Sequence, residues 1–138
     1  MTTITVQTIV TKPIQVVWDS FTQPEHITKW AFASSDWESP YAENDVRVGG
    51  RFLTRMSAKD GSAAFDFTGT YTEVIDKEKI MYAIDDNRKA VVTFSVTDEG
   101  VLVEEAFETE NVHPEERQRE GWQAILTNFK EYTESLGM

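Results

Sequence analysis

Cysteine is absent from the 138-residue chain, and that absence removes several kinds of chemistry. Disulfides, thiolate nucleophiles, iron–sulfur clusters and thiolate zinc sites all require cysteine. Histidine is almost as scarce, since His26 and His113 are the only two and neither has the spacing of a metal ligand. We interpret both as solvent-facing residues near helix starts, and we expect no metal site and no cofactor.

Basic residues are also few, with 13 Lys and Arg against 24 Asp and Glu and a formal net charge of −11. Negative charge repels nucleic-acid phosphates and anionic membrane surfaces, so we expect no nucleic-acid partner. No apolar run approaches the roughly 18 residues of a membrane-spanning helix, and the N-terminus lacks the basic leader of a signal peptide. We therefore expect no membrane insertion and a cytoplasmic protein.

Familiar catalytic motifs are missing as well. The sequence contains no G-x-S-x-G turn for a serine nucleophile and no glycine-rich loop of the phosphate-binding kinds. No residue is assigned a catalytic role on this basis. What is present is 40% apolar residues in a length that suits one domain, which we place at residues 1–138.

The hydrophobic pattern changes its period along the chain. Alternation over the first ten residues predicts a strand, and Ile14, Val17, Trp18 and Phe21 mark one face of a helix that follows Pro13. A second short helix is expected to open at Pro24, before a long loop over 31–49 with an irregular strand near Tyr41. Further strands are expected at about 50–58, 64–75, 79–86, 89–97 and 101–110, before a long amphipathic helix from Pro114 onward.

Short polar turns between consecutive strands indicate hairpins, and therefore an antiparallel sheet. Six or seven strands are enough for the sheet to curl, and the last helix must bury its apolar stripe against the concave face. The sequence thus predicts an α+β architecture in which a curled antiparallel sheet holds the last helix on its concave face and the two early helices close one end.

Aromatic side chains dominate one face of the predicted sheet. A helix that stands off a sheet lined in this way can leave an apolar cavity for a small ligand. The commoner alternative is that the rings interdigitate and fill the space. Gly69 favours a cavity, because a missing side chain in mid-strand either marks a bulge or leaves room. The candidate lining residues are Trp30, Phe52, Phe65, Phe67, Tyr71, Tyr82, Phe94, Glu105, Trp122 and Leu126.

Glu105 stands out among these candidates, because it shares the parity of Val101, Val103 and Phe107 on its strand. If that parity faces the helix, a carboxyl lies inside the fold and must be paired, hydrogen-bonded or protonated. Carboxylates are mostly exposed, so the commoner arrangement is reversed parity or a bulge, with Glu104 turned inward. Both arrangements are compatible with the sequence.

Several segments together resemble a known family. They are Val17-Trp18 eight residues after Ile9, FTQPEHITKW at 21–30, VGGRF at 48–52, FTGTYTEV at 67–74 and GWQAILTNF at 121–129. The set is similar to the START-like superfamily, and more narrowly to the branch named for the C-terminal domain of the activator of the ninety-kilodalton heat-shock ATPase. Where many relatives have a second tryptophan after Trp30, this chain has Ala31-Phe32.

The resemblance implies a helix-grip fold with a deep cavity, and it transfers no catalytic residues. Our first hypothesis is a binding protein for an apolar or aromatic small molecule. The alternatives are an aromatase- or cyclase-like enzyme that uses the same cavity, and a co-chaperone that contacts a heat-shock ATPase. A homodimer is also open, because Phe32 or Trp37 in the long loop could form an exposed apolar patch.

Overall fold

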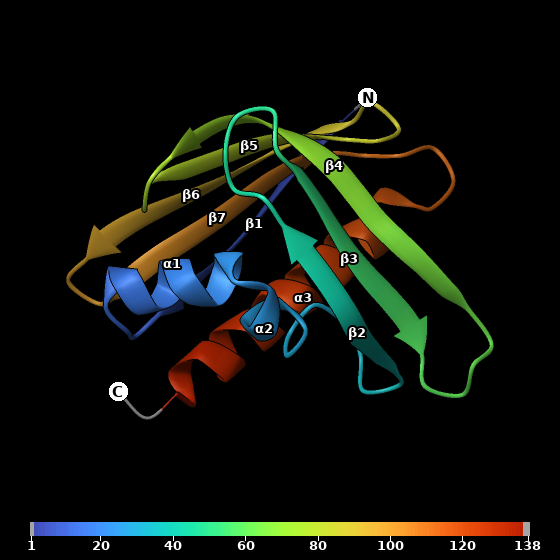
Figure 1. Ribbon diagram of the computed structural model, residues 1–138, viewed down its shortest axis with the longest axis horizontal. Helices are drawn as coiled ribbons and strands as arrows, with labels where there is room; N and C mark the ends of the chain where they lie inside the picture. Colours follow the sequence, from blue (N-terminus) through green and yellow to red (C-terminus); the bar gives the residue numbers. More distant parts are fainter. Residues whose placement is uncertain (1, 137–138) are drawn as a thin grey trace.

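A curled antiparallel sheet of seven strands wraps one long helix in the computed structural model, which describes residues 2–136 (Figure 1). The strands are β1 (Thr3–Val10), β2 (Trp37–Asn44), β3 (Arg51–Ala58), β4 (Ala64–Ile75), β5 (Lys79–Ile84), β6 (Lys89–Thr97) and β7 (Gly100–Glu108). The helices are α1 (Ile14–Thr22), α2 (Pro24–Ile27) and α3 (Glu115–Glu134). This arrangement confirms the predicted helix-grip fold.

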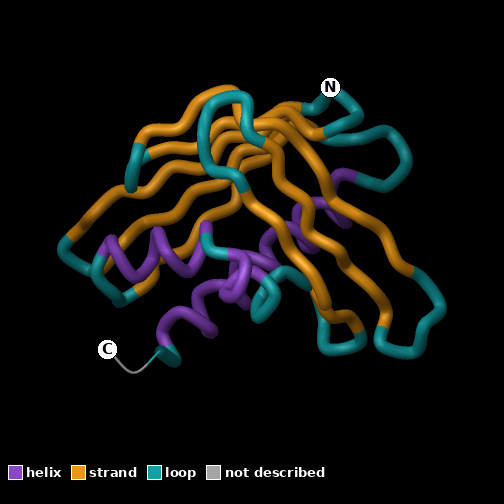
Figure 2. The backbone as a smooth tube through the Cα atoms, viewed as in Figure 1, coloured by secondary structure: helices purple, strands orange, loops and turns teal. Residues whose placement is uncertain are grey.

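The strand order is β1-β7-β6-β5-β4-β3-β2, so every neighbour from β2 to β7 is a hairpin partner and only β1 pairs out of sequence. The tight turns require unusual backbone conformations, with a positive φ of 62° at Lys77 and 74° at Asn87. This meander forms the curled sheet, and α3 lies across its concave face. Figure 2 shows that the helical segments lie on one side of the strands.

Strand β2 confirms the irregular strand expected near Tyr41 and takes up much of the segment expected to be a long loop. Residues 37–44 form a strand along β3, and the register shifts between Glu38 and Tyr41. Pro40 lies within that irregular step, which is where an edge strand tolerates a residue without a backbone N–H. The bulge breaks the two-residue alternation, so the sequence predicted this strand only as an irregular one, without its bounds.

The β1 edge is covered by side chains of α3. Gln123 donates a hydrogen bond to the Gln7 carbonyl at 3.3 Å, and the Lys130 ammonium donates to the Ile9 carbonyl at 2.6 Å. Open sheet edges otherwise invite pairing with another chain. These bonds therefore protect the edge and also hold α3 across the concave face.

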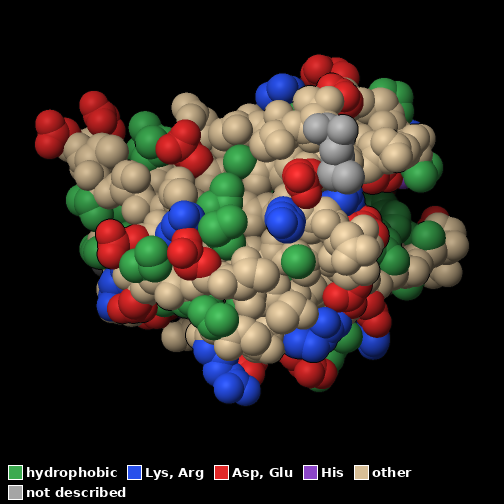
Figure 3. All heavy atoms as spheres, turned by 90° about the horizontal axis from the view of Figure 1, so that it is seen from above, with side chains coloured by type: hydrophobic (Ala, Val, Ile, Leu, Met, Phe, Trp, Pro, Cys, Tyr) green, Lys and Arg blue, Asp and Glu red, His purple; other side chains and the backbone are tan. Residues whose placement is uncertain are grey.

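The face seen from above in Figure 3 carries acidic and basic side chains interspersed with small apolar patches. Two ion pairs lie on the outer side of the sheet. Arg55 of β3 lies 2.8 Å from Asp66 of the neighbouring β4, and Arg51 of β3 lies 2.7 Å from Asp85 in the turn after β5. Exposed pairs of this kind contribute little stability. They keep the outer face polar, while the concave face is apolar.

Within residues 2–136, none of the helices combines the length and the apolarity needed to cross a membrane.

Candidate functional site

A cavity of about 310 Å³ lies between the sheet and the N-terminal half of α3. Strands β3, β4, β5 and β7 supply one wall, and Gln118, Trp122 and Ile125 of α3 supply the opposite wall. Most of the predicted candidates border it, namely Trp30, Phe52, Phe65, Phe67, Tyr71, Tyr82, Glu105 and Trp122.

Phe94 and Leu126, which were also candidates, do not border the cavity. Phe94 packs edge-to-face against Trp18 and Phe21 of α1, with ring centroids 5.2 and 5.4 Å apart, and Leu126 is 0% exposed in the same core. Alternation correctly identified their face of the sheet or helix. It carried no information about where α1 fills the space above that face.

The aromatic wall is built around Phe52 of β3. Its ring centroid lies 5.5 Å from that of Phe67, 5.4 Å from that of Tyr71 and 5.0 Å from that of Tyr82. Tilted and edge-to-face contacts of this kind are favourable and restrict ring motion. The wall is therefore already shaped before any ligand enters.

Gly69 does not leave the open space that we expected. A Cβ atom at Gly69 would lie 2.6 Å from the Phe52 ring and 2.6 Å from the Ala83 carbonyl oxygen. The ring of Phe52 fills the room above the glycine, and the nearby register shift of the strand lies between Tyr71 and Glu73. Gly69 thus positions the aromatic wall and adds no volume to the cavity.

Phe65 lies at the rim of the cavity and is 52% exposed. Met56 is its partner across the β3–β4 ladder, and the Trp37 ring meets its edge at a centroid distance of 5.9 Å. The hairpin of β3 and β4 extends away from α3 at this end (Figure 1). Phe65 is consequently not part of the buried core, although its strand parity matches that of Phe67.

Trp122 forms the helix side of the cavity. Its ring stacks on Phe107 of β7 with centroids 4.0 Å apart and planes inclined by 6°, and its edge faces Phe67 at 6.2 Å. The contact joins α3 directly to the sheet at one end of the cavity. It therefore sets the separation between the two walls.

Polar groups at one end of the cavity bind each other. The Tyr71 hydroxyl donates to the Asn44 amide oxygen, and the Asn44 amide nitrogen donates to the Thr22 carbonyl at 2.7 Å. Burial raises the pKa of Tyr71, so its hydroxyl stays protonated. Asn44 was not a candidate, because it fell in the segment expected to be a loop.

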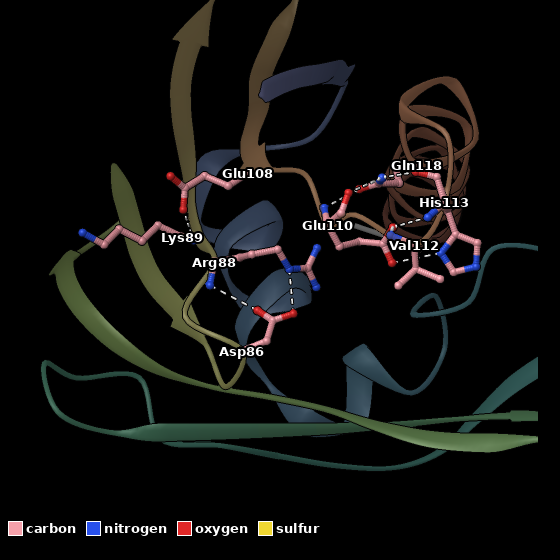
Figure 4. A network of polar contacts seen from close by, with 8 residues as sticks. All are labelled: Asp86, Arg88, Lys89, Glu108, Glu110, Val112, His113 and Gln118. Carbon is pink, nitrogen blue, oxygen red and sulfur yellow. Dashed lines mark hydrogen bonds and ion pairs between the residues drawn. The ribbon is translucent and has the colours of Figure 1, made fainter. Parts of the chain in front are cut away.

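A second network closes the other end, where the segment after β7 meets the start of α3 (Figure 4). Gln118 accepts from the Glu110 N–H at 3.0 Å and donates to the His113 carbonyl at 2.8 Å. The Glu110 carboxylate accepts from the backbone and ring nitrogens of His113 at 2.6 and 2.9 Å. These bonds lower the pKa of Glu110, so it is ionised at neutral pH.

Arg88 is a cavity residue that sequence analysis missed. It lies in the β5–β6 turn, where polar residues predict a solvated hairpin, yet its side chain is only 17% exposed. Its Nε atom lies 2.7 Å from Asp86 (Figure 4). A long aliphatic stem lets the guanidinium reach inward from a surface turn, and no sequence signal marks that direction.

Glu105 is the buried carboxyl of the cavity, at 8% exposure. Its parity is the inward one, while Glu104 lies on the other face and is half-buried. Its register partners are Val6 on β1 and Val92 on β6, both buried and apolar. Burial in these surroundings raises the pKa of Glu105 from 4.5 to about 8, so the carboxyl is mainly protonated at neutral pH.

His113 is exposed just before α3, which confirms the expectation for that residue, whereas His26 is half-buried. His26 Nδ1 lies 2.6 Å from the Tyr132 hydroxyl, and His113 binds Glu110 as described above. No group of three or more His, Asp or Glu side chains within residues 2–136 could hold a metal ion.

The comparisons with known proteins agree with this architecture. The AHSA1-like protein from Aeromonas hydrophila, solved by NMR in solution, is 41% identical to this chain with a TM-score of 0.91, over 97% of this chain and 93% of that one. A solution structure from Cytophaga hutchinsonii is 46% identical with a TM-score of 0.82, over 95% and 91%. A crystal structure from Chromobacterium violaceum, 23% identical with a TM-score of 0.85 over 99% and 100%, shares the fold.

No curated protein matches the chain at a significant level. The model of the family described as "Activator of Hsp90 ATPase homolog 1-like protein" matches residues 11–134, which include every residue that borders the cavity. Together with the two relatives above 40% identity, this match confirms the resemblance found in the sequence. The chain belongs to the Activator of Hsp90 ATPase homolog 1-like family within the START-like fold.

Proposed function

We propose that this protein binds an apolar or aromatic small molecule in the cavity between the sheet and α3. The observation that carries the proposal is an aromatic-walled cavity of about 310 Å³ that opens to the surface at its Phe65 rim. Ligand pockets of proteins occupy about 300–1,000 Å³, and a dry cavity of about 150 Å³ takes up benzene. A bicyclic aromatic molecule matches the available space.

Two further features support binding. Proteins with this START-like fold commonly bind small ligands, and the Phe52 cluster holds its rings in place without a ligand. A preshaped wall avoids the entropic cost of ordering side chains on binding. Burial of roughly 250 Å² of apolar ligand surface contributes on the order of 6 kcal/mol before association costs, so we expect micromolar affinity at best.

A fluorescence titration with the uncharged probe N-phenyl-1-naphthylamine tests the proposal. Thr54 of β3 borders the cavity and is buried, so Thr54→Phe should fill part of it and weaken probe binding at least tenfold. Val96→Phe adds an aromatic ring to an exposed strand position, 71% accessible, and should leave binding within twofold of the wild type. Equal affinity in all three proteins would place the probe elsewhere and contradict the proposal.

A second candidate is a cyclase-type enzyme, and the specific observation that favours it is Glu105. A carboxyl that stays protonated near neutral pH can act as a general acid on a ligand in the cavity. A linear poly-β-keto thioester, followed by mass spectrometry, tests this candidate. We expect ring closure with the wild type and none with Glu105→Gln; rates equal to buffer for both proteins would exclude it.

The homodimer and the heat-shock ATPase partner stay proposals. Phe32 and Trp37 are half-buried, and Trp37 already contacts Phe65, which reduces the apolar surface left for a second copy. Sedimentation equilibrium tests the dimer. Stimulation of a purified heat-shock ATPase by added protein tests the chaperone role, which the family name alone supports.

A further inference from the structure

We propose that Glu105 determines which ligands the cavity accepts, by donating a hydrogen bond from its neutral carboxyl to an acceptor oxygen of an uncharged ligand. This inference rests on the proposed binding function and narrows the ligand class. The favoured molecule is an apolar, ring-containing compound with one carbonyl or similar oxygen that points toward the sheet.

The first step is an account of the polar groups that border the cavity. Tyr71 binds Asn44, Gln118 binds the Glu110 and His113 backbone, and Arg88 binds Asp86, as described above. Thr54 and Tyr82, which also border the cavity, make no side-chain hydrogen bond with any residue from 2 to 136, and neither does the carboxyl of Glu105. Its oxygens therefore face the cavity with their hydrogen-bonding capacity unused.

A buried carboxyl without a partner destabilises a fold, because it loses its bonds to water and gains none in exchange. The residues paired with Glu105 on the two neighbouring strands, Val6 and Val92, are aliphatic, so an aliphatic side chain would suit the position of Glu105 as well. Buried polar groups that lack a partner are uncommon in native proteins and call for a specific reason. A ligand oxygen that completes the hydrogen bond supplies one here.

Tyr82 extends the polar spot on the neighbouring side of the cavity. Its hydroxyl has no hydrogen-bond partner among the described residues, and the charges of Glu105 and Arg88 both influence it. Burial raises the pKa of Tyr82 well above its usual value, so it too is a neutral donor. Tyr82 lies on β5 and Glu105 on β7, with β6 between them, so the cavity carries two neutral donors on one wall.

The surrounding charges argue against an ionic ligand. Arg88 is already paired with Asp86, and the ionised Glu110 borders the cavity and would repel an anion. A cation would require Glu105 to ionise among apolar neighbours, where the loss of hydration outweighs much of the attraction. An uncharged oxygen needs neither change.

Titration gives the inference a distinctive signature. Of the titratable groups that border the cavity with Glu105, Tyr71 and Tyr82 have raised pKa values and Glu110 has a lowered one. Among these groups only Glu105, with a pKa of about 8, changes charge between pH 6 and pH 9.5. Ionisation removes the donor and places a negative charge against the ligand oxygen.

The experiment compares four naphthalene ligands by calorimetry, on the wild type, Glu105→Gln, Glu105→Leu and the outward-facing control Glu104→Leu. The ligands are 2-acetylnaphthalene, its isostere 2-isopropylnaphthalene, 2-naphthoate and 2-naphthylmethylammonium. At pH 6 we expect the ketone to bind the wild type and Glu104→Leu about tenfold more tightly than the hydrocarbon, the equivalent of one hydrogen bond. Glu105→Leu should reduce that ratio to below threefold, and Glu105→Gln should keep most of it.

At pH 9.5 the ratio should fall below threefold in the wild type and persist in Glu105→Gln, whose amide is a donor at both pH values. A ratio near one for the wild type at pH 6, or an unchanged ratio in Glu105→Leu, overturns the inference while hydrocarbon binding still supports the proposed function. Tightest binding of the anion or the cation also overturns it. Failure of all four ligands to bind overturns the proposed function itself.

Discussion

The two halves of α3 lie over the same sheet and have opposite surroundings. Leu126, Phe129 and Thr133 in the C-terminal half are 0% exposed, whereas Gln118 and Trp122 in the N-terminal half border the cavity. In Figure 1, α1 and α2 lie beside the C-terminal half only. Helices α1 and α2 thus pack against the C-terminal half of α3, and the cavity lies beside the N-terminal half, where no further helix covers the sheet.

The closed end is filled mainly by rings from α1 and the segment after α2. Phe129 meets Phe21 and Trp30 edge-to-face, with centroids 5.2 and 5.0 Å apart. The Trp30 indole also donates to the Ser20 carbonyl at 2.9 Å, which ties that segment to α1. Phe21 and Trp30 also border the cavity, so these rings form the boundary between the closed end and the ligand site.

Truncation of two adjacent residues should show the largest contrast. Leu126→Ala creates a new void in the closed end and should cost about 3–5 kcal/mol of unfolding free energy. Ile125 borders the existing cavity, so Ile125→Ala only enlarges it and should cost about 1–2 kcal/mol. Urea unfolding measures both, and equal losses would mean that the two halves are packed alike.

Glu105→Gln should stabilise the open end by an amount that depends on pH. The folded-state pKa of Glu105, about 8, lies above its unfolded value of 4.5, so the folded state binds the proton more tightly. Wild-type stability therefore falls by about 1.4 kcal/mol for each pH unit between these values, and it levels off above them. The variant should be equal to the wild type below pH 4.5 and about 3 kcal/mol more stable at pH 7.

Urea unfolding of wild type and variant from pH 4 to pH 9 measures this difference. Glu104→Gln, on the outer face, serves as the control and should show a small effect at every pH. A difference between Glu105→Gln and wild type that stays constant across this range would show that Glu105 is not protonated in the fold.

Thr133→Val probes the closed end with a smaller effect. The Thr133 hydroxyl is fully buried and has no hydrogen-bond partner among residues 2–136. Replacement of the hydroxyl by a methyl group of similar size removes an unsatisfied polar atom, and should raise the unfolding free energy by about 1 kcal/mol. Thermal unfolding should show a higher Tm; a lower Tm would indicate a bonded hydroxyl.

Gly121→Ala should give the smallest effect, at the open end. Gly121 lies within α3, and a Cβ added there would have no atom within 4 Å. Alanine stabilises a helix interior by about 0.5–1 kcal/mol relative to glycine. The same measurement should detect this gain without a change in probe binding, and a loss of stability would indicate a contact on the helix surface at that point.

Much of the fold could be predicted because its hairpins are local. The turns at Asp60-Gly61 and Asp85-Asp86-Asn87 separate strands whose alternation is regular. That alternation predicted that either Glu105 or Glu104 points inward, but it did not decide between them. An irregular strand near Tyr41 was predicted, but the bounds of β2 were not, because its bulge at Pro40 breaks the alternation. The sequence could not show that Phe94 is buried and Phe65 exposed. Alternation along a strand identifies the face of the sheet on which a side chain lies, but not whether a helix covers that part of the face.

The order of residues by itself determined the antiparallel meander, the amphipathic last helix and the excess of negative charge, because each depends on near neighbours or on composition. Only the tertiary structure decided that Phe52 fills the space above Gly69, that Arg88 turns inward, and that Glu105 has no partner. These three features arise where segments distant in sequence meet. The volume of the cavity between the sheet and α3 depends on how far α1 extends along α3, and no local sequence pattern determines that distance.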